Sequence, residues 1–177
     1  MNEEILKGLL EENIIFIKGK LTNEIADYVQ HSLFYFMQKG YPEIKIYITS
    51  SGGSVDIGLA IYDFLRHYPG GKIGIVQGYA KSMAVLVLQG CDIRKAMKHS
   101  VFLIHNLSQS DVKLEEIRTP EKINKLKEKM EKSQKKINRV IAKNSKLTEE
   151  EISKNFNAER YISPKEAKEL GIIDEII

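Results

Sequence analysis

Ser82 stands between a short β-like run and an almost wholly apolar segment. Residues 73–77 resemble a strand, and residues 78–88 read GYAKSMAVLVL. A serine at the start of a buried helix meets unpaired backbone N–H groups and the positive end of the helix dipole. A nucleophile is well placed there, because the same N–H groups can hold the anion it generates. The alternative is that Ser82 is only a helix N-cap, which is the commoner role of such a serine.

One of the four histidines is placed where a general base would be useful. His105 directly follows residues 101–104, the apolar run Val-Phe-Leu-Ile. Parallel α/β proteins tend to keep their chemistry at the carboxyl ends of strands. His105 is therefore the candidate base, and a buried, hydrogen-bonded structural histidine is the alternative.

Paired glycines and a lysine extend this constellation. Residues 50–54, Ser-Ser-Gly-Gly-Ser, follow a strand-like run and predict a tight turn before a helix. Glycine lets a ligand approach the main chain, although a simple βα turn also accounts for the pair. Lys81 could in principle serve as the base of a Ser-Lys pair. A residue next to a nucleophile in a tight turn usually points elsewhere, so a surface or site-lining role is favoured.

The elements that position these residues alternate between strand and helix patterns. Helical spacing of apolar residues predicts helices over 1–13 and 23–39, a third after residue 54, and a fourth from Ser82. Strand patterns cover 14–17, 44–49, 73–77, about 94–97, 101–104 and 172–177. Alternating strands and helices imply right-handed crossovers and a largely parallel sheet.

A long helix is predicted over about 119–144. Thr119-Pro120 provides an N-cap followed by proline at the first helical position. At about 25 residues and ~38 Å the helix is longer than the body of such a domain needs. Its apolar stripe consists of Ile123, Leu126, Met130, Ile137, Val140 and Ile141. This stripe suggests contact with another subunit.

Composition narrows the class of protein. The chain has 177 residues, 42% hydrophobic and 29% charged, with a net charge of +3. These values predict one ordinary globular domain and give no reason to expect a nucleic-acid partner. The lone Cys91 excludes an internal disulfide and suits a reducing compartment. Because neither a membrane-spanning run nor a signal peptide is recognisable, we expect a cytoplasmic protein without a membrane partner.

Five segments in order resemble the proteolytic subunit family of Clp proteases. They are residues 48–55 (ITSSGGSV), 60–63 (AIYD), 78–84 (GYAKSMA), 103–106 (LIHN) and 159–167 (ERYISPKEA). The resemblance runs from about residue 9 to residue 176. It implies a crotonase-like spiral of βαβ units with a projecting handle helix, in one peptidase domain covering residues 1–177.

The resemblance also implies roles for individual residues. Ser82 matches the family's nucleophile and His105 its general base. Gly53 and Met83 match the positions whose N–H groups form the oxyanion hole, and Glu159 stands at the position of the triad acid. No cofactor or metal is implied. The implied activity is that of a serine endopeptidase working inside an oligomeric ring.

The sequence departs from the family pattern at several places. Glu159 replaces the usual aspartate, and Ser51 replaces the usual proline before the glycine pair. Residues 106–111 replace a glycine-rich segment next to the family's ring-stacking strand. Only eight residues precede Leu9, so much of the family's axial gate is expected to be missing, which predicts a relatively open pore.

The family's partners and two alternative functions follow from this resemblance. It implies peptide or unfolded protein substrates, assembly into a heptamer or double heptamer, and an AAA+ unfoldase as a further partner. The first alternative is a non-catalytic ring subunit, suggested by the changes at Glu159 and Ser51. The second is an acyl-CoA enzyme of crotonase type, in which the oxyanion hole would serve a thioester enolate.

Overall fold

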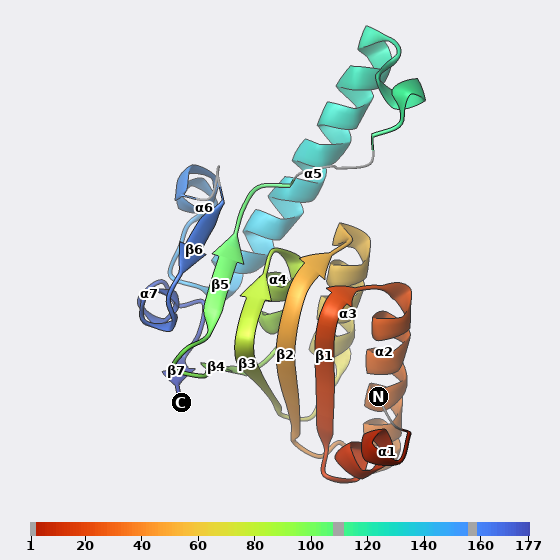
Figure 1. Cartoon of the computed structure of the whole chain (residues 1–177), viewed down its shortest axis with the longest axis vertical. Helices are drawn as coiled ribbons and strands as arrows, with labels where there is room; N and C mark the ends of the chain where they lie inside the picture. Colours follow the sequence, from red (N-terminus) through yellow and green to blue (C-terminus); the bar gives the residue numbers. More distant parts are fainter. Residues whose placement is uncertain (1–2, 108–111, 156–158) are drawn as a thin grey trace.

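The computed structural model describes residues 3–107, 112–155 and 159–177, and a sheet of parallel strands forms its centre (Figure 1). In spatial order the strands are β1 (Ile14–Leu21), β2 (Ile44–Gly53), β3 (Lys72–Lys81), β4 (Ile93–Ala96) and β7 (Glu175–Ile176). Each of these neighbouring pairs is parallel. The helices that follow β1, β2 and β3 are α2 (Asn23–Gln38), α3 (Val55–His67) and α4 (Met83–Leu88). They cover one face of the sheet, which confirms the predicted parallel α/β fold.

Strand β2 shows how the sequence chooses the covered face. Ile44, Ile46 and Ile48 are completely buried beneath the helices. The intervening Tyr47 points to the opposite face, where its ring stacks on Phe16 of β1 with centroids 5.1 Å apart. Alternate residues of this strand therefore point to opposite faces of the sheet. The isoleucine face packs on the helices, and the other face lies outside this core.

Strand β3 divides the sheet. Its residues 73–76 pair with β4, and its residues 79–81 pair with β5 (Val101–Ile104) along the same edge. Strand β5 also pairs with β6 (Arg160–Ile162), and this pair is antiparallel. Strand β6 is not predicted from the sequence, because three residues are too few to show a period.

Several strand limits differ from the predictions. β2 continues through the predicted turn and still pairs with Leu21 of β1 at Gly53. β3 continues to Lys81 instead of ending at 77, whereas the terminal strand covers only 175–176 of the predicted 172–177. Pairing partners decide where a strand ends, and local sequence does not reveal them.

The predicted long helix is α5 (Pro120–Asn144), and Thr119 caps it by accepting a hydrogen bond from the Lys122 N–H at 3.4 Å. The sequence predicted that the whole apolar stripe of this helix contacts another subunit. In the structure the stripe is divided into a buried part and an exposed part. Ile137 and Ile141 are buried against the body of the protein, whereas Ile123 is 46% exposed on the part that projects (Figure 1). The short helix η1 (Leu114–Ile117) lies beside that projecting end.

Arg94 joins three segments at the base of this helix. Its guanidinium group pairs with the Asp174 carboxylate at 2.6 Å and donates to Gln89 Oε1 at 2.6 Å. It also donates to the main-chain carbonyl of Asn144, the last residue of α5. The base of α5, the C-terminal tail and the end of α4 are thus held by one side chain.

The remaining helices are α1 (Glu3–Glu11), α6 (Glu149–Asn155) and α7 (Pro164–Glu169). Capping boxes begin the last two of these helices, because Glu151 accepts from the Thr148 N–H and Glu166 from the Ser163 N–H. Among the residues described, no helix is long and apolar enough to cross a membrane.

Candidate active site

The turn at Ser82 is strained. Ser82 has φ 52° and ψ −125°, a conformation that favours glycine, and it joins β3 directly to α4. Its N–H donates to the carbonyl of Leu103 at 2.8 Å, which ties the turn to β5. Such a backbone costs on the order of 1–3 kcal/mol and tends to persist at functional sites. It resembles the nucleophile elbow of α/β-hydrolases, which exposes a serine hydroxyl at the end of a sheet.

The alternative prediction was that the Ser82 side chain only caps a helix. The structure shows no such capping contact. Ser82 occupies the N-cap position of α4, but its side chain makes no capping hydrogen bond. The hydroxyl is therefore not engaged with the helix.

The two glycines after Ser51 allow the main chain to pass close to this turn. A Cβ atom on Gly52 would lie 2.6 Å from the Lys81 carbonyl oxygen and 2.9 Å from the Met83 nitrogen. A Cβ atom on Gly53 would lie 2.6 Å from the carbonyl oxygen of Leu21. Any larger residue would force these chain segments apart. The bend is held from within, because Gly52 N–H donates to the Ser50 hydroxyl at 3.1 Å.

Met83 is the first residue of α4. The N–H groups of a helix's first turn have no acceptor within the helix, so the Met83 N–H belongs to this group. Its side chain is 2% exposed and packs on α3, where a Cβ atom on Gly58 would lie only 2.6 Å from its Cε. This packing fixes the start of α4 relative to the end of β2.

His105 directly follows β5, whose residues 102–104 are buried. Its Nδ1 lies 2.6 Å from the main-chain carbonyl oxygen of Asn106. A carbonyl can only accept a hydrogen bond, so this contact requires a proton on Nδ1, and in the neutral ring Nε2 then has the free lone pair. This is the tautomer that a general base needs.

His105 directly follows β5, and Glu159 directly precedes β6. Leu103 pairs with Tyr161 and Ile104 with Arg160, so one further step of this antiparallel register would set His105 opposite Glu159. Residues opposite each other on neighbouring strands have Cβ atoms about 4.5–5.5 Å apart. The Glu159 side chain is exposed, and among the described residues no hydrogen bond joins it to His105.

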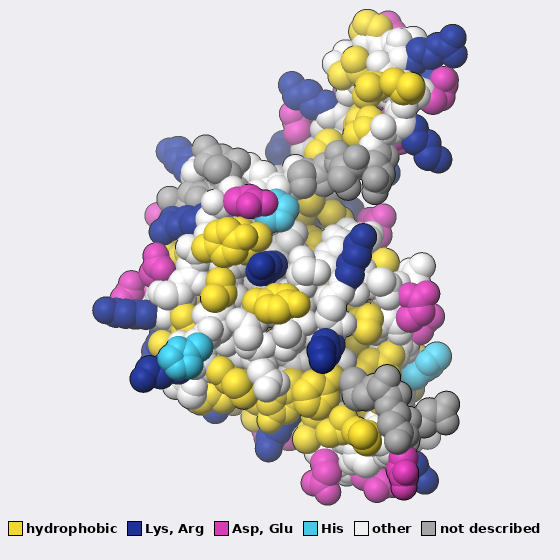
Figure 2. Space-filling model, viewed as in Figure 1, with side chains coloured by type: hydrophobic (Ala, Val, Ile, Leu, Met, Phe, Trp, Pro, Cys, Tyr) yellow, Lys and Arg dark blue, Asp and Glu magenta, His cyan; other side chains and the backbone are white. Residues whose placement is uncertain are grey.

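Lys81 is engaged away from Ser82. Its ammonium group lies 5.2 Å from the ring centroid of Tyr79 and 5.5 Å from that of Tyr161. Figure 2 shows lysine and hydrophobic side chains interleaved on this face of the molecule. These two cation–π contacts hold the ammonium group against the two aromatic rings. The favoured surface role of Lys81 agrees with this placement.

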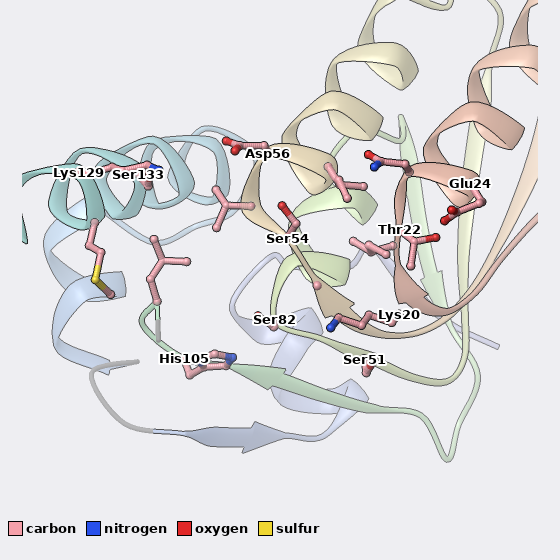
Figure 3. Close-up of a pocket in the computed structure, with 17 residues that line it drawn as sticks. Lys20, Thr22, Glu24, Ser51, Ser54, Asp56, Ser82, His105, Lys129 and Ser133 are labelled. Carbon is pink, nitrogen blue, oxygen red and sulfur yellow. The ribbon is translucent and has the colours of Figure 1, made fainter. Parts of the chain in front are cut away.

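A cleft of about 760 Å³ connects these elements (Figure 3). Ser82, His105 and Gly53 line it together with the ends of β1 and β2, the starts of α2 and α3, and the middle of α5. Four charged residues of the lining were not recognised in the sequence: Lys20, Glu24, Asp56 and Lys129. These four residues come from segments far apart in the chain. They form a common lining only after folding, so no local sequence motif identifies them.

Cys91 does not compete with Ser82 as a nucleophile. Its thiol is buried, and this burial raises the pKa of Cys91 to about 12. The thiolate that would react is therefore almost absent at neutral pH.

A parallel βα sheet with a strained serine turn and a histidine on the neighbouring strand defines an α/β protein with a candidate acyl-transfer site. Comparison with known proteins assigns the family. The sequence pattern described as Clp protease matches residues 1–177. This chain therefore belongs to the Clp protease family.

Two individual proteins are similar to the chain over nearly its full length. ATP-dependent Clp protease proteolytic subunit 3 of Streptomyces avermitilis is 28% identical, over 100% of this chain and 80% of that protein. A solved structure of a ClpP1 mutant from Listeria monocytogenes superposes with a TM-score of 0.87 at 23% identity, covering 98% of this chain and 95% of that one. The predicted crotonase-like fold is thereby confirmed.

Proposed function

We propose that this chain is a serine endopeptidase, the proteolytic subunit of a Clp-type protease. The observation that carries the proposal is Ser82 itself, held at φ 52° with an unengaged hydroxyl in a cleft that His105 also lines. Membership of the Clp protease family supports it.

In the first step the Ser82 hydroxyl oxygen attacks the carbonyl carbon of a peptide bond while His105 Nε2 takes its proton. The carbonyl oxygen becomes an oxyanion, and the N–H groups of Gly53 and Met83 donate to it. Both belong to chain segments that are tightly packed, so they need not reorganise as charge develops.

In the second step the tetrahedral intermediate collapses. The C–N bond breaks, and the leaving amine receives the proton from His105. Water then attacks the ester on Ser82 while His105 accepts a proton from it. The C–O bond to Ser82 breaks, His105 returns the proton to the Ser82 oxygen, and the carboxylic acid is released. The reaction balances without a metal or an organic cofactor.

Glu159 is proposed as the acid of the triad. The β5–β6 register pairs Ile104 with Arg160, and one further step of this register would set Glu159 opposite His105, which supports the role. Nδ1 would then exchange the Asn106 carbonyl for a charged acceptor, which stabilises the imidazolium formed during attack.

A non-catalytic ring subunit is the second candidate. The specific observation in its favour is that His105 Nδ1 is bound to the main-chain carbonyl of Asn106 and not to Glu159. Such a subunit would keep the fold and the assembly surfaces but would not turn over peptides.

A fluorophosphonate probe separates the two candidates. We expect covalent labelling of the unmodified protein at Ser82, located by mass spectrometry of the digested adduct. Ser82→Ala should not label, whereas Ser54→Ala, which removes another serine lining the same cleft, should label normally. Failure of the unmodified protein to label would favour the non-catalytic subunit.

Assembly into rings is proposed on the basis of the projecting arm. Large hydrophobic side chains are exposed there: Leu114 is 83%, Ile117 43% and Ile123 46% exposed. Figure 2 shows hydrophobic side chains along this arm. An exposed apolar cluster of this kind is typical of a surface that another subunit covers.

Ile123→Glu is expected to reduce the molecular mass of the assembly measured by size-exclusion chromatography with light scattering. A buried, unpaired carboxylate in a subunit interface is strongly unfavourable. Lys125→Glu, an exposed position of the same helix, is the control and should preserve the assembly. Ile137 is unsuitable for this test because it is buried within the subunit itself. An unchanged mass for Ile123→Glu would remove the arm from the interface.

The proposed substrates are peptides and unfolded proteins, because an open cleft can accept an extended chain but not a folded domain. An AAA+ unfoldase is the corresponding partner for folded substrates, and cytoplasm is the proposed location. Short peptides should need no such partner, since they can reach the cleft by diffusion.

A further inference from the structure

Lys20 places a positive charge in the active-site cleft. It belongs to the end of β1 and lines the cleft together with Ser82 and His105. In Figure 3 its ammonium group points toward Ser82. Neither its position nor its charge is needed for the catalytic steps described above.

The ammonium group of Lys20 has no partner among the residues that the structure describes. Some lysines elsewhere are paired, for example Lys72 with Asp92 at 2.8 Å and Lys95 with Glu175 at 2.6 Å. No ion pair or hydrogen bond engages the Lys20 side chain within the described ranges. An unpaired cation facing a binding cleft is available to a ligand.

The backbone of Lys20 is held close to the catalytic turn. In the β1–β2 register Lys20 pairs with Gly52, immediately after a register shift between Gly19 and Lys20. Gly52 in turn packs so closely on the turn that its Cβ atom would lie 2.9 Å from the Cβ of Ser82. Lys20 is therefore anchored one strand away from the nucleophile.

The acidic residues of the cleft do not neutralise this charge. Figure 3 shows the Glu24 and Asp56 carboxylates beyond Thr22 and Ser54, apart from the Lys20 ammonium group. The Thr22 side chain and the backbone N–H of Glu24 donate hydrogen bonds to the Glu24 carboxylate and lower its pKa. This carboxylate is therefore already bonded to groups at the start of α2. Lys129, the other cation of the lining, comes from α5.

We propose that Lys20 is a specificity-determining residue that binds a carboxylate of the peptide substrate close to the bond that is cleaved. The source is either an Asp or Glu side chain or the free C-terminal carboxylate of a short peptide. This inference rests on the proposed function, because it requires that the cleft binds peptides.

The size of the effect follows from the setting of the lysine. Lys20 is exposed, so solvent weakens the ion pair compared with a buried one. Hydrogen bonds to charged groups are nevertheless stronger than neutral ones. We expect a preference of about five- to tenfold for acidic over neutral peptides, decreasing as ionic strength rises.

The test compares matched peptides blocked at both ends that differ only by Glu or Gln at one position within three residues of the cleaved bond. The ratio of kcat/KM for Glu over Gln is measured for the unmodified protein, for Lys20→Gln and for Lys20→Glu. We expect this ratio to fall to about one in Lys20→Gln and below one in Lys20→Glu. Lys18→Gln is the matched control, an exposed lysine of the same strand that does not line the cleft, and should keep the original ratio.

A second set of peptides identifies the source of the carboxylate. Gln-containing peptides with a free C-terminal acid are compared with the same peptides as amides. If Lys20→Gln changes only the Glu-to-Gln ratio of the blocked peptides, the carboxylate belongs to a side chain. If it changes only the ratio between free-acid and amide peptides, the carboxylate is the C-terminus. Dependence in neither set overturns the inference.

Binding measurements keep this result separate from the question of catalysis. Fluorescence anisotropy of labelled peptides on Ser82→Ala, with and without Lys20→Gln, gives the same Glu-to-Gln ratio from Kd values without turnover. If peptides are hydrolysed but the ratio does not depend on Lys20, the inference fails and the proposed function stands. If binding depends on Lys20 but no peptide is hydrolysed, the proposed catalysis fails and the inference stands. Equal losses of affinity for the Glu and Gln peptides in Lys20→Gln would also overturn the inference about Lys20.

Discussion

Ser82→Ala and His105→Ala should each lower kcat for short blocked peptides by roughly 10⁶-fold, and the double variant should be little worse than either single one. The physical reason is that the two side chains act as a unit. Without His105 the Ser82 hydroxyl keeps its proton, and without Ser82 the histidine has no nucleophile to activate. Initial rates with a fluorogenic peptide under substrate saturation provide the measurement.

Two controls make this result specific. His99→Ala removes a histidine that does not line the catalytic cleft, and it should retain turnover. Circular dichroism should show unchanged secondary structure in all variants. If the losses at Ser82 and His105 instead multiply in the double variant, the two residues contribute independently and the proposed pairing is wrong.

Glu159→Gln is expected to lower kcat by something like 10³–10⁴, about the loss caused by amidation of the acid in other serine triads. An amide in this position can present an N–H to Nδ1, which favours the wrong tautomer, and it does not stabilise the imidazolium. Glu159→Asp should retain part of the activity or exceed the original, because it restores the residue that the family usually has. The same fluorogenic assay measures both.

Glu169→Gln is the matched control for this prediction, since Glu169 is an exposed glutamate on α7 that does not line the cleft. It should behave like the unmodified protein. If Glu159→Gln also does so while Ser82→Ala is inactive, the main-chain carbonyl of Asn106 is a sufficient partner for Nδ1. The site is then a Ser-His dyad.

Much of the candidate site was predictable because its signals are local. Ser82 and His105 are marked by their places beside short apolar runs, and the five ordered motifs are specific to one family. The main helices follow from periodicity and caps, as at Thr119. These features depend on neighbours within a few residues, which is the range over which helical spacing and capping act.

The tertiary structure decided which segments meet. The pairing of β5 with β6 brings Arg160, the neighbour of Glu159, opposite Ile104, the neighbour of His105, although more than fifty positions separate them in the chain. The same folding divides the stripe of α5, burying Ile137 and leaving Ile123 exposed. A periodic pattern reveals that a face is apolar but does not identify what covers it.

The strained backbone of Ser82 and the position of Lys20 are further results of folding. A serine does not favour φ 52° by itself; the hydrogen bond to Leu103 and the close packing of Gly52 impose it. Lys20 looks like any exposed strand residue in the sequence, and it becomes part of the cleft only because β1 ends beside β2. The sequence by itself therefore determined the chemical groups and their local elements, whereas long-range pairing and close packing decided their geometry.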